Sequence, residues 1–269
     1  MTLTADAPPQ AAAPPSGDFV PEPRMVPESF LLTTGVFEQD LEVRWLPHSN
    51  EEHVLIWSER GAVSVVVDDR MHVVLPGCGL WIPRGVVHAG WAAGGAAFRE
   101  TLFAPESWTP TWDGTTAVDL NAALRHLLIH LAVTGMPEDE RLRAQQVCID
   151  LLEPLRFRGI AVPIPQDPRI RKIVDGILRS PADGRSLEQW AHCLNVSPRT
   201  ISRAFSADVA MSFAQWRRLA RMASACTLLA EGATVSVTGR RVGYGTTSAF
   251  VAAFHKVVGC TPGELLATE

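Results

Sequence analysis

The sequence predicts an α+β protein, with an antiparallel β-barrel and two following helices in its first part and an all-α domain in its second. Residues 41–93 alternate short runs rich in Val, Ile and Trp with turn-forming residues, which is typical of antiparallel strands. The last hundred residues place apolar side chains four positions apart, as helices with one buried face do. A chain of 269 residues with 46% hydrophobic residues is long enough for two such domains.

The boundary between the two domains is marked by prolines and by a change of charge. Pro163, Pro165 and Pro168 interrupt any helix and favour an extended segment. Residues 1–166 contain 11 basic and 21 acidic side chains, whereas residues 167–269 contain 13 and 8. A basic second half favours a nucleic-acid partner. The expected organisation is a disordered tail (1–28), a β-rich domain with two helices (29–158), a linker (159–166) and a helical domain (167–269).

Cysteine usage and the N-terminal composition favour a cytoplasmic protein. The five cysteines form no CxxC pair and have no matched spacing, which argues against a zinc knuckle or a disulfide framework. The first residues are rich in Pro, Ala and Ser and lack the basic and apolar regions of a secretion signal. Because no apolar run reaches transmembrane length, no membrane partner is expected.

The basic half contains an internal repeat. The stretches SPRTISRAFSADVAMS (197–212) and TTSAFVAAFHKVVGCT (246–261) align at an offset of 49 residues. Each begins with a hydroxyl residue suited to cap a helix. Before the first copy, SLEQWAHCLN (186–195) carries a capping box and ends in an Asn, which tolerates the left-handed turn. The pattern predicts a helix-turn-helix unit, whose second helix can enter a DNA major groove.

The second copy has the same plan. Gly243 replaces the turn residue Asn195, and Gly239 replaces the small Ala191 at the helix crossing. The stretch SFAQWRRLARMASACTLLAEG (212–232) between the copies reads as one long helix. This helix is expected to hold the two units at a fixed separation, so that both can reach one face of DNA.

These motifs resemble the DNA-binding domain of AraC-type transcriptional regulators over residues 167–266, above all in GYGTTSAF (243–250) and in GCTPGEL (259–265). The resemblance implies that Arg199, Ser202 and Arg203 read bases, and that Thr247, Ser248 and Ala252 occupy the matching places in the second unit. The predicted DNA-contact set is Ser197, Arg199, Thr200, Ser202, Arg203, Thr246, Thr247 and Ser248.

The side-chain chemistry ranks the two units. Arginine can bond both acceptors of guanine, whereas Ser and Thr bond to phosphate or to any base. The first unit should therefore specify the sequence and the second should mainly position the protein. The alternative for these arginines is a solvated helix face. Phosphate contact and solvation are both open for Arg217, Arg218, Arg240 and Arg241.

The acidic half contains PRGVVH (83–88), which together with HSN (48–50) and Gly61 resembles the cupin barrel that many AraC-type regulators carry, over residues 30–105. In metal-binding cupins four ligands converge inside the barrel. The corresponding positions here are His48, Asn50, Val54 and His88. Because two of the four ligand types are missing, no metal and no cofactor are expected.

His88 has three open interpretations: a polar anchor in an effector pocket, a packed core histidine, or a metal ligand. The first is preferred, with Trp57 and Trp81 as apolar walls of the pocket. His53, one position from Val54, is expected to face the other way. The predicted effector-binding set is His48, Asn50, Trp57, Trp81 and His88.

Two amphipathic helices are expected after the barrel, in AVDLNAALRHLLIHLAV (117–133) and EDERLRAQQVCIDLLEPL (138–155). Their apolar faces are wide enough to cover the barrel and still meet a partner. The resemblance implies that residues 117–155 form a homodimer. The alternative is a simple helical cap on one barrel.

The predicted function is sequence-specific regulation of transcription in the cytoplasm, with a small-molecule effector bound in the barrel and no enzymatic activity. The resemblance implies double-stranded DNA with promoter half-sites, an unknown effector, a second copy of the chain and RNA polymerase as partners. The alternatives are a cupin metalloenzyme, such as an oxygenase or isomerase, and a DNA-binding module that needs no effector.

Overall fold

The computed structural model describes residues 17–21, 24–38, 41–106, 108, 110, 112, 114–155 and 160–266. The chain forms two compact units, one of residues 1–67 with 74–158 and one of residues 68–73 with 159–269. Most of the expected tail lies outside the described residues. Within that tail, Gly17–Phe19 forms strand β1, which pairs in parallel with β3 (Val43–His48).

The described part of the first unit consists of two sheets rather than one closed barrel. Its strands pair antiparallel apart from β1 with β3, and an isolated parallel bridge joins Ser58 and Pro76. One sheet has the order β1-β3-β8-β5 within this unit, and the other has the order β11-β10-β7-β4-β9-β2. The predicted α+β class is confirmed. The remaining strands are β2 (Leu32–Glu38), β4 (His53–Arg60), β5 (Val63–Val67), β7 (Cys78–Ile82), β8 (His88–Ala92), β9 (Ala97–Phe103), β10 (Thr116–Asp119) and β11 (Glu153–Pro154).

Strand β4 is buried on both faces and divides the apolar core in two. Val54 and Ile56 belong to a cluster that also contains Trp45 and Val65 of the opposite sheet, so this cluster fills the space between the sheets. Successive side chains of a strand point to opposite faces. Leu55 therefore packs on the outer face, against the helices.

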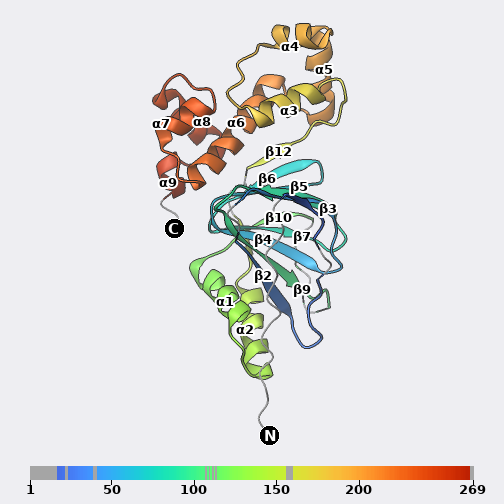
Figure 1. Cartoon of the computed structure of the whole chain (residues 1–269), viewed down its shortest axis with the longest axis vertical. Coiled ribbons are helices and arrows are strands. Elements are labelled where there is room, and N and C mark those ends of the chain that lie inside the picture. Colours follow the sequence, from blue (N-terminus) through green and yellow to red (C-terminus); the bar gives the residue numbers. More distant parts are fainter. Residues whose placement is uncertain are drawn as a thin grey trace. The chain divides into compact units, whose positions relative to one another are not determined.

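Two helices, α1 (Ala122–Val133) and α2 (Glu138–Asp150), cover that outer face (Figure 1). Leu124 and Leu128 of α1 are fully buried in the same cluster as Leu55. The Gln145 side chain fixes α2 to the start of β2. Its Oε1 accepts from the Leu31 N–H at 2.8 Å, and its Nε2 donates to the Leu32 carbonyl at 2.9 Å.

The second unit is helical apart from a short strand pair. Strand β6 (Arg70–Val74) pairs with β12 (Ala161–Pro163), which lies inside the expected linker. Helix α6 contacts helices on both sides of it in sequence, as Figure 1 shows. The helices are α3 (Arg171–Arg179), α4 (Leu187–Leu194), α5 (Pro198–Val209), α6 (Phe213–Ala230), α7 (Val235–Arg241), α8 (Thr247–Val258) and α9 (Pro262–Leu266).

The predicted helix signals are present in both helix-turn-helix units. Ser186 and Gln189 form the capping box of α4, and Asn195 ends that helix at φ 54°. In the second helix-turn-helix unit, a Cβ on Gly239 would lie 3.1 Å from Phe250, which is tighter than an ordinary contact, so glycine favours the close approach of α7 and α8. Among the described residues, no helix combines the length and the apolar character that crossing a membrane requires.

We predict that Gly90→Ala destabilises the first unit. A Cβ at this position of β8 would lie 2.5 Å from the Ser64 carbonyl oxygen and still closer to the Trp45 ring. Overpacking of this kind costs about 1–3 kcal/mol. Gly184→Ala is the matched control because nothing lies within 4 Å of its added Cβ. Thermal unfolding should show a lower Tm for Gly90→Ala alone, and equal Tm values for the two variants would contradict the packing described.

Candidate functional site

The exposed face of α5 carries the predicted base-reading residues. Arg199, Ser202 and Arg203 are exposed, whereas Ile201 and Phe205 are buried on the opposite face. The spacing of three and four residues puts the three polar side chains on one side of the helix. The two guanidinium groups therefore face outward from a firmly packed helix.

The predicted hydroxyl residues at the helix starts act as caps. Ser197 Oγ accepts from the Thr200 N–H at 3.1 Å and lies 2.9 Å from the Thr200 hydroxyl. Thr246 Oγ1 accepts from the Ala249 N–H at 3.2 Å. These bonds satisfy N–H groups that a helix start leaves unpaired. Ser197 and Thr246 thus fix the first turns of α5 and α8, and both side chains are short.

Helix α8 presents a surface of shorter side chains. Thr247, Ser248 and Ala252 are exposed, as are His255 and Lys256 in the last turn. Side chains this short in the first turns reach less far than the arginines of α5. The predicted difference in DNA reading between the two helix-turn-helix units stays a prediction.

The other four arginines that the sequence singled out, on α6 and α7, differ in their hydrogen bonds and in their exposure. Arg217 Nη1 donates to the Arg185 carbonyl at 2.7 Å, so this side chain is bound within the unit. Arg240 Nη1 donates to Ser236 Oγ at 3.0 Å on the same helix. Arg218 and Arg241 are exposed.

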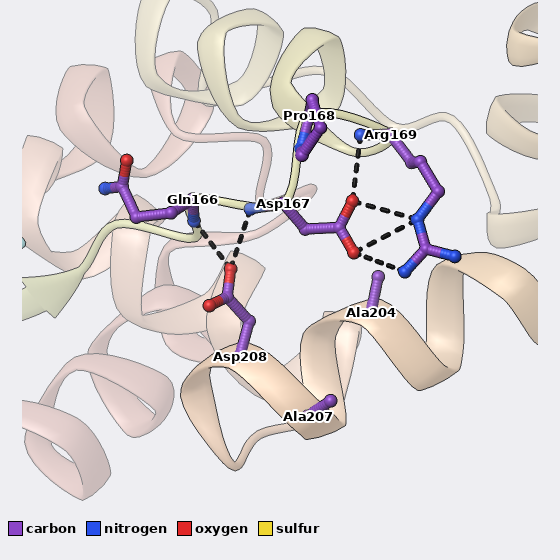
Figure 2. Close-up of a pocket in the computed structure, with 7 residues that line it drawn as sticks. All are labelled: Gln166, Asp167, Pro168, Arg169, Ala204, Ala207 and Asp208. Carbon is purple, nitrogen blue, oxygen red and sulfur yellow. Dashed lines mark hydrogen bonds and ion pairs between the residues drawn. The ribbon is translucent and has the colours of Figure 1, made fainter.

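An open pocket lies between the C-terminal end of α5 and the segment before α3 (Figure 2). Asp208 accepts backbone N–H groups from Gln166 at 2.6 Å and from Asp167 at 2.9 Å. Asp167 in turn binds the Arg169 guanidinium through both carboxylate oxygens. These polar groups bond to one another, and their hydrogen bonds hold the segment before α3 against α5. The sequence carried no signal for Asp208.

A cavity of about 30 Å³ lies between the two sheets of the first unit, and both predicted histidines line it. The rings of His48 and His88 are 4.4 Å apart, so the turn at Gly85 (φ 74°) does bring β8 to this position. A cavity of this size holds a few water-sized groups. Its other walls are Phe19, Pro21, Phe37, Trp45, Ile56, Phe98 and Glu100.

Burial sets the charge state of the groups in this cavity. Burial lowers the pKa of His88 to about 4 and also lowers the pKa of His48, so both rings are neutral at neutral pH. Burial raises the pKa of the Glu100 carboxyl, against the opposing effect of the Arg24 guanidinium 3.5 Å away. Two neutral imidazoles and a carboxyl group thus meet in an aromatic surrounding.

The structure does not bring Trp57, Trp81 or Asn50 into this cavity. Both tryptophans lie in the cluster that faces the helices, where Trp81 stacks on His53 at 5.0 Å. Trp57 lies outside the cavity because odd-numbered residues of β4 point to the face opposite to that of Ile56. Trp81 of β7 belongs to the same outer cluster as Trp57. The residues that do form the walls, above all Trp45, Phe98 and Glu100, come from β3 and β9. Their side chains could have been placed only with the register of those strands known.

Among the described residues, few side chains that could bind a metal ion surround the two histidines. Within the part of the chain that the structure describes, no group of three or more His, Cys, Asp or Glu side chains is arranged to hold a metal ion. Asn50 contributes its carbonyl oxygen, which accepts from the Gly85 N–H at 2.8 Å and fixes the turn before β8.

Comparisons with known proteins match both units. A model described as AraC-like ligand binding domain matches residues 38–149, and one described as helix-turn-helix domain matches residues 190–268. The HTH-type transcriptional regulator NimR of Escherichia coli (strain K12) is 30% identical over 224 residues, which cover 82% of this chain and 81% of NimR. RipA of Corynebacterium diphtheriae is 27% identical over 80% of this chain and 60% of its own length. The C-terminal domain of AraT from Geobacillus stearothermophilus is 30% identical over 38% of this chain and 87% of that domain, with a TM-score of 0.36.

The two sheets with their cavity and the paired helix-turn-helix units define a DNA-binding transcriptional regulator with a ligand-binding domain. The chain belongs to the AraC family of transcriptional regulators. The family assignment predicted from the sequence motifs is thereby confirmed.

We predict that acid weakens the first unit through His88. The pKa of His88 is about 4 in the folded chain and 6.5 in the reference state. The unfolded chain therefore binds a proton first, and stability falls as the pH drops from 6.5 to about 4. The shift corresponds to a loss on the order of 3 kcal/mol.

His88→Gln should reduce this acid sensitivity, as measured by denaturant unfolding between pH 7 and pH 4. His126→Gln, which changes an exposed histidine of α1, is the control. Burial also lowers the pKa of His48 and raises the pKa of Glu100, and comparing variants at each pH cancels most of the contribution of these two groups. An unchanged pH dependence in His88→Gln would contradict the burial of a neutral ring.

Proposed function

We propose that this regulator recognises a double-stranded promoter sequence mainly through α5. Helix α8 positions the second helix-turn-helix unit on the same DNA. The observation that carries the proposal is the pair of exposed arginines, Arg199 and Arg203, on the outer face of a capped and packed helix. Each can form a bidentate bond to a guanine. The shorter side chains of α8 suit contacts to phosphate or to any base.

The regulatory half of the proposal concerns the cavity between the sheets. A small-molecule effector binds there, contacts His48 and His88, and controls DNA binding. The chain acts by binding and not by catalysis, and it works in the cytoplasm, where its DNA target lies. RNA polymerase is a further partner at the promoter.

The third element is a homodimer through residues 117–155. Val133 at the end of α1 is 66% exposed and Val147 on α2 is 46% exposed, although both belong to the helix pair that covers the sheet. Contact with the same helices of a second copy would cover these two side chains. Two copies would bring two sets of recognition helices to repeated half-sites.

Full-length protein should select a defined sequence from a random DNA library, and its affinity should fall steeply with salt because phosphate contacts release counterions. On the selected DNA, Arg203→Ala should cost about 1–3 kcal/mol and relax the preference at one or two base pairs. Arg241→Ala, a control on an exposed arginine of α7, should weaken specific and random DNA about equally. Fluorescence anisotropy on both DNAs gives the comparison. Equal losses on both DNAs for Arg203→Ala would refute α5 as the reading helix.

The dimer is tested with matched valine substitutions. Val133→Asp places a charge on the proposed interface and should raise the dimer dissociation constant at least about tenfold. Val87→Asp, on a 58% exposed valine outside α1 and α2, should leave it unchanged. Analytical ultracentrifugation measures both. A monomeric wild-type chain, or equal effects of the two variants, would exclude this interface.

A further inference from the structure

We infer that the cavity between the sheets selects a ligand whose inserted head is a cationic or N–H-rich hydrogen-bond donor, such as an amidinium or ammonium group, and rejects carboxylates. The inference rests on the proposed effector role of the cavity and names the chemical class of that effector. It follows from the hydrogen-bonding state of two histidine side chains.

The backbone fixes the tautomer of both histidines. The Nδ1 atom of His48 lies 3.0 Å from the Leu46 carbonyl oxygen, and that of His88 lies 3.1 Å from the Val86 carbonyl oxygen. A carbonyl oxygen can only accept, so each Nδ1 must carry the proton. In a neutral ring the Nε2 atom then has no hydrogen and offers a lone pair.

Both Nε2 atoms are buried, and neither has a hydrogen-bond partner among the residues that the structure describes. His88 is only 2% exposed to solvent. A buried acceptor without a partner costs free energy, which a bound donor recovers. Because the two rings are 4.4 Å apart and line one cavity, a single head with two N–H groups can satisfy both.

The charges around the cavity favour the same class. Glu100 lines the cavity, and the buried Glu52 adds a second carboxyl group close enough to act on it electrostatically. The Arg24 guanidinium pairs with Glu100, so two carboxyl groups stand beside one guanidinium group at this end of the cavity. A carboxylate ligand would meet two imidazole lone pairs, which can only accept, and would add a further acidic group beside Glu100.

The aromatic walls also suit a cation. The Phe37 and Phe98 rings stack at 5.0 Å, and the Arg24 guanidinium lies over the Phe37 ring at 4.6 Å. A planar cation over an aromatic face is attracted by the ring. The chain itself thus places a group of the proposed chemistry against one of these walls.

The size of the cavity limits the head to a few heavy atoms. Acetamidinium and acetate are suitable probes because they have the same shape and the same number of heavy atoms but opposite charge and opposite hydrogen-bonding roles. Full-length protein is titrated with acetamidinium chloride, with sodium acetate and with sodium chloride as the salt control. Binding is followed by the histidine ring ¹⁵N signals and by the melting temperature.

Acetamidinium should shift the Nε2 signals of His48 and His88 and bind at least about tenfold more tightly than acetate. His48→Leu and His88→Leu should each abolish this preference, and His126→Leu should keep it. If a leucine variant fails to fold, the ¹⁵N spectrum of the wild-type protein still decides. Nε2-protonated rings, or equal binding of the two probes, would overturn the inference.

Two further measurements separate the outcomes. One equivalent of Zn²⁺ that binds metal-free protein and is lost in the leucine variants would make the pair a metal site and overturn the donor class. Binding to the selected DNA is measured on the same preparation. Intact DNA binding without amidinium preference refutes this inference alone, whereas loss of specific DNA binding refutes the proposed function and leaves the probe comparison standing.

Discussion

The structure of the first unit depends on the alternation of side chains along β4. Val54 and Ile56 fill the space between the sheets, and Leu55 and Trp57 pack under the two helices. A shift of this strand by one residue would exchange every contact on both faces. The same strand therefore supports the proposed effector cavity on one side and the proposed dimer helices on the other. A ligand that moves Ile56, which lines the cavity, acts on a strand whose opposite face carries α1.

The second unit has a comparable constraint in how the chain before α3 is held. Trp216 of α6 donates from Nε1 to the Pro163 carbonyl at 2.7 Å, and Asp208 of α5 accepts two N–H groups from residues 166 and 167. The extended segment is thus bound to the helix that carries Arg199 and Arg203. The segment before α3 and the proposed reading helix are therefore joined by direct hydrogen bonds.

Local signals predicted much of this organisation. The caps at Ser186 and Ser197, the turn at Asn195 and the small residue at Gly239 depend on neighbours a few positions away, and the sequence displays them. The proximity of His48 and His88 was predicted from the turn before His88 and from the resemblance of this stretch to a known family. Long-range register was not accessible in the same way. Trp57 was predicted to be a wall of the pocket. Its actual direction depends on which face of its sheet meets the second sheet, and the sequence alone does not show this.

The central claim is that α5 reads guanine bases in the major groove. Methylation interference on the selected DNA tests it directly, because a methyl group on guanine N7 removes the acceptor that a bidentate arginine needs. If α5 reads guanine in this way, interference should be strong at one or two guanines in a single major groove, and one of these signals should be lost when Arg199 is replaced by alanine. Undiminished binding to DNA methylated at every guanine N7 would contradict the claim.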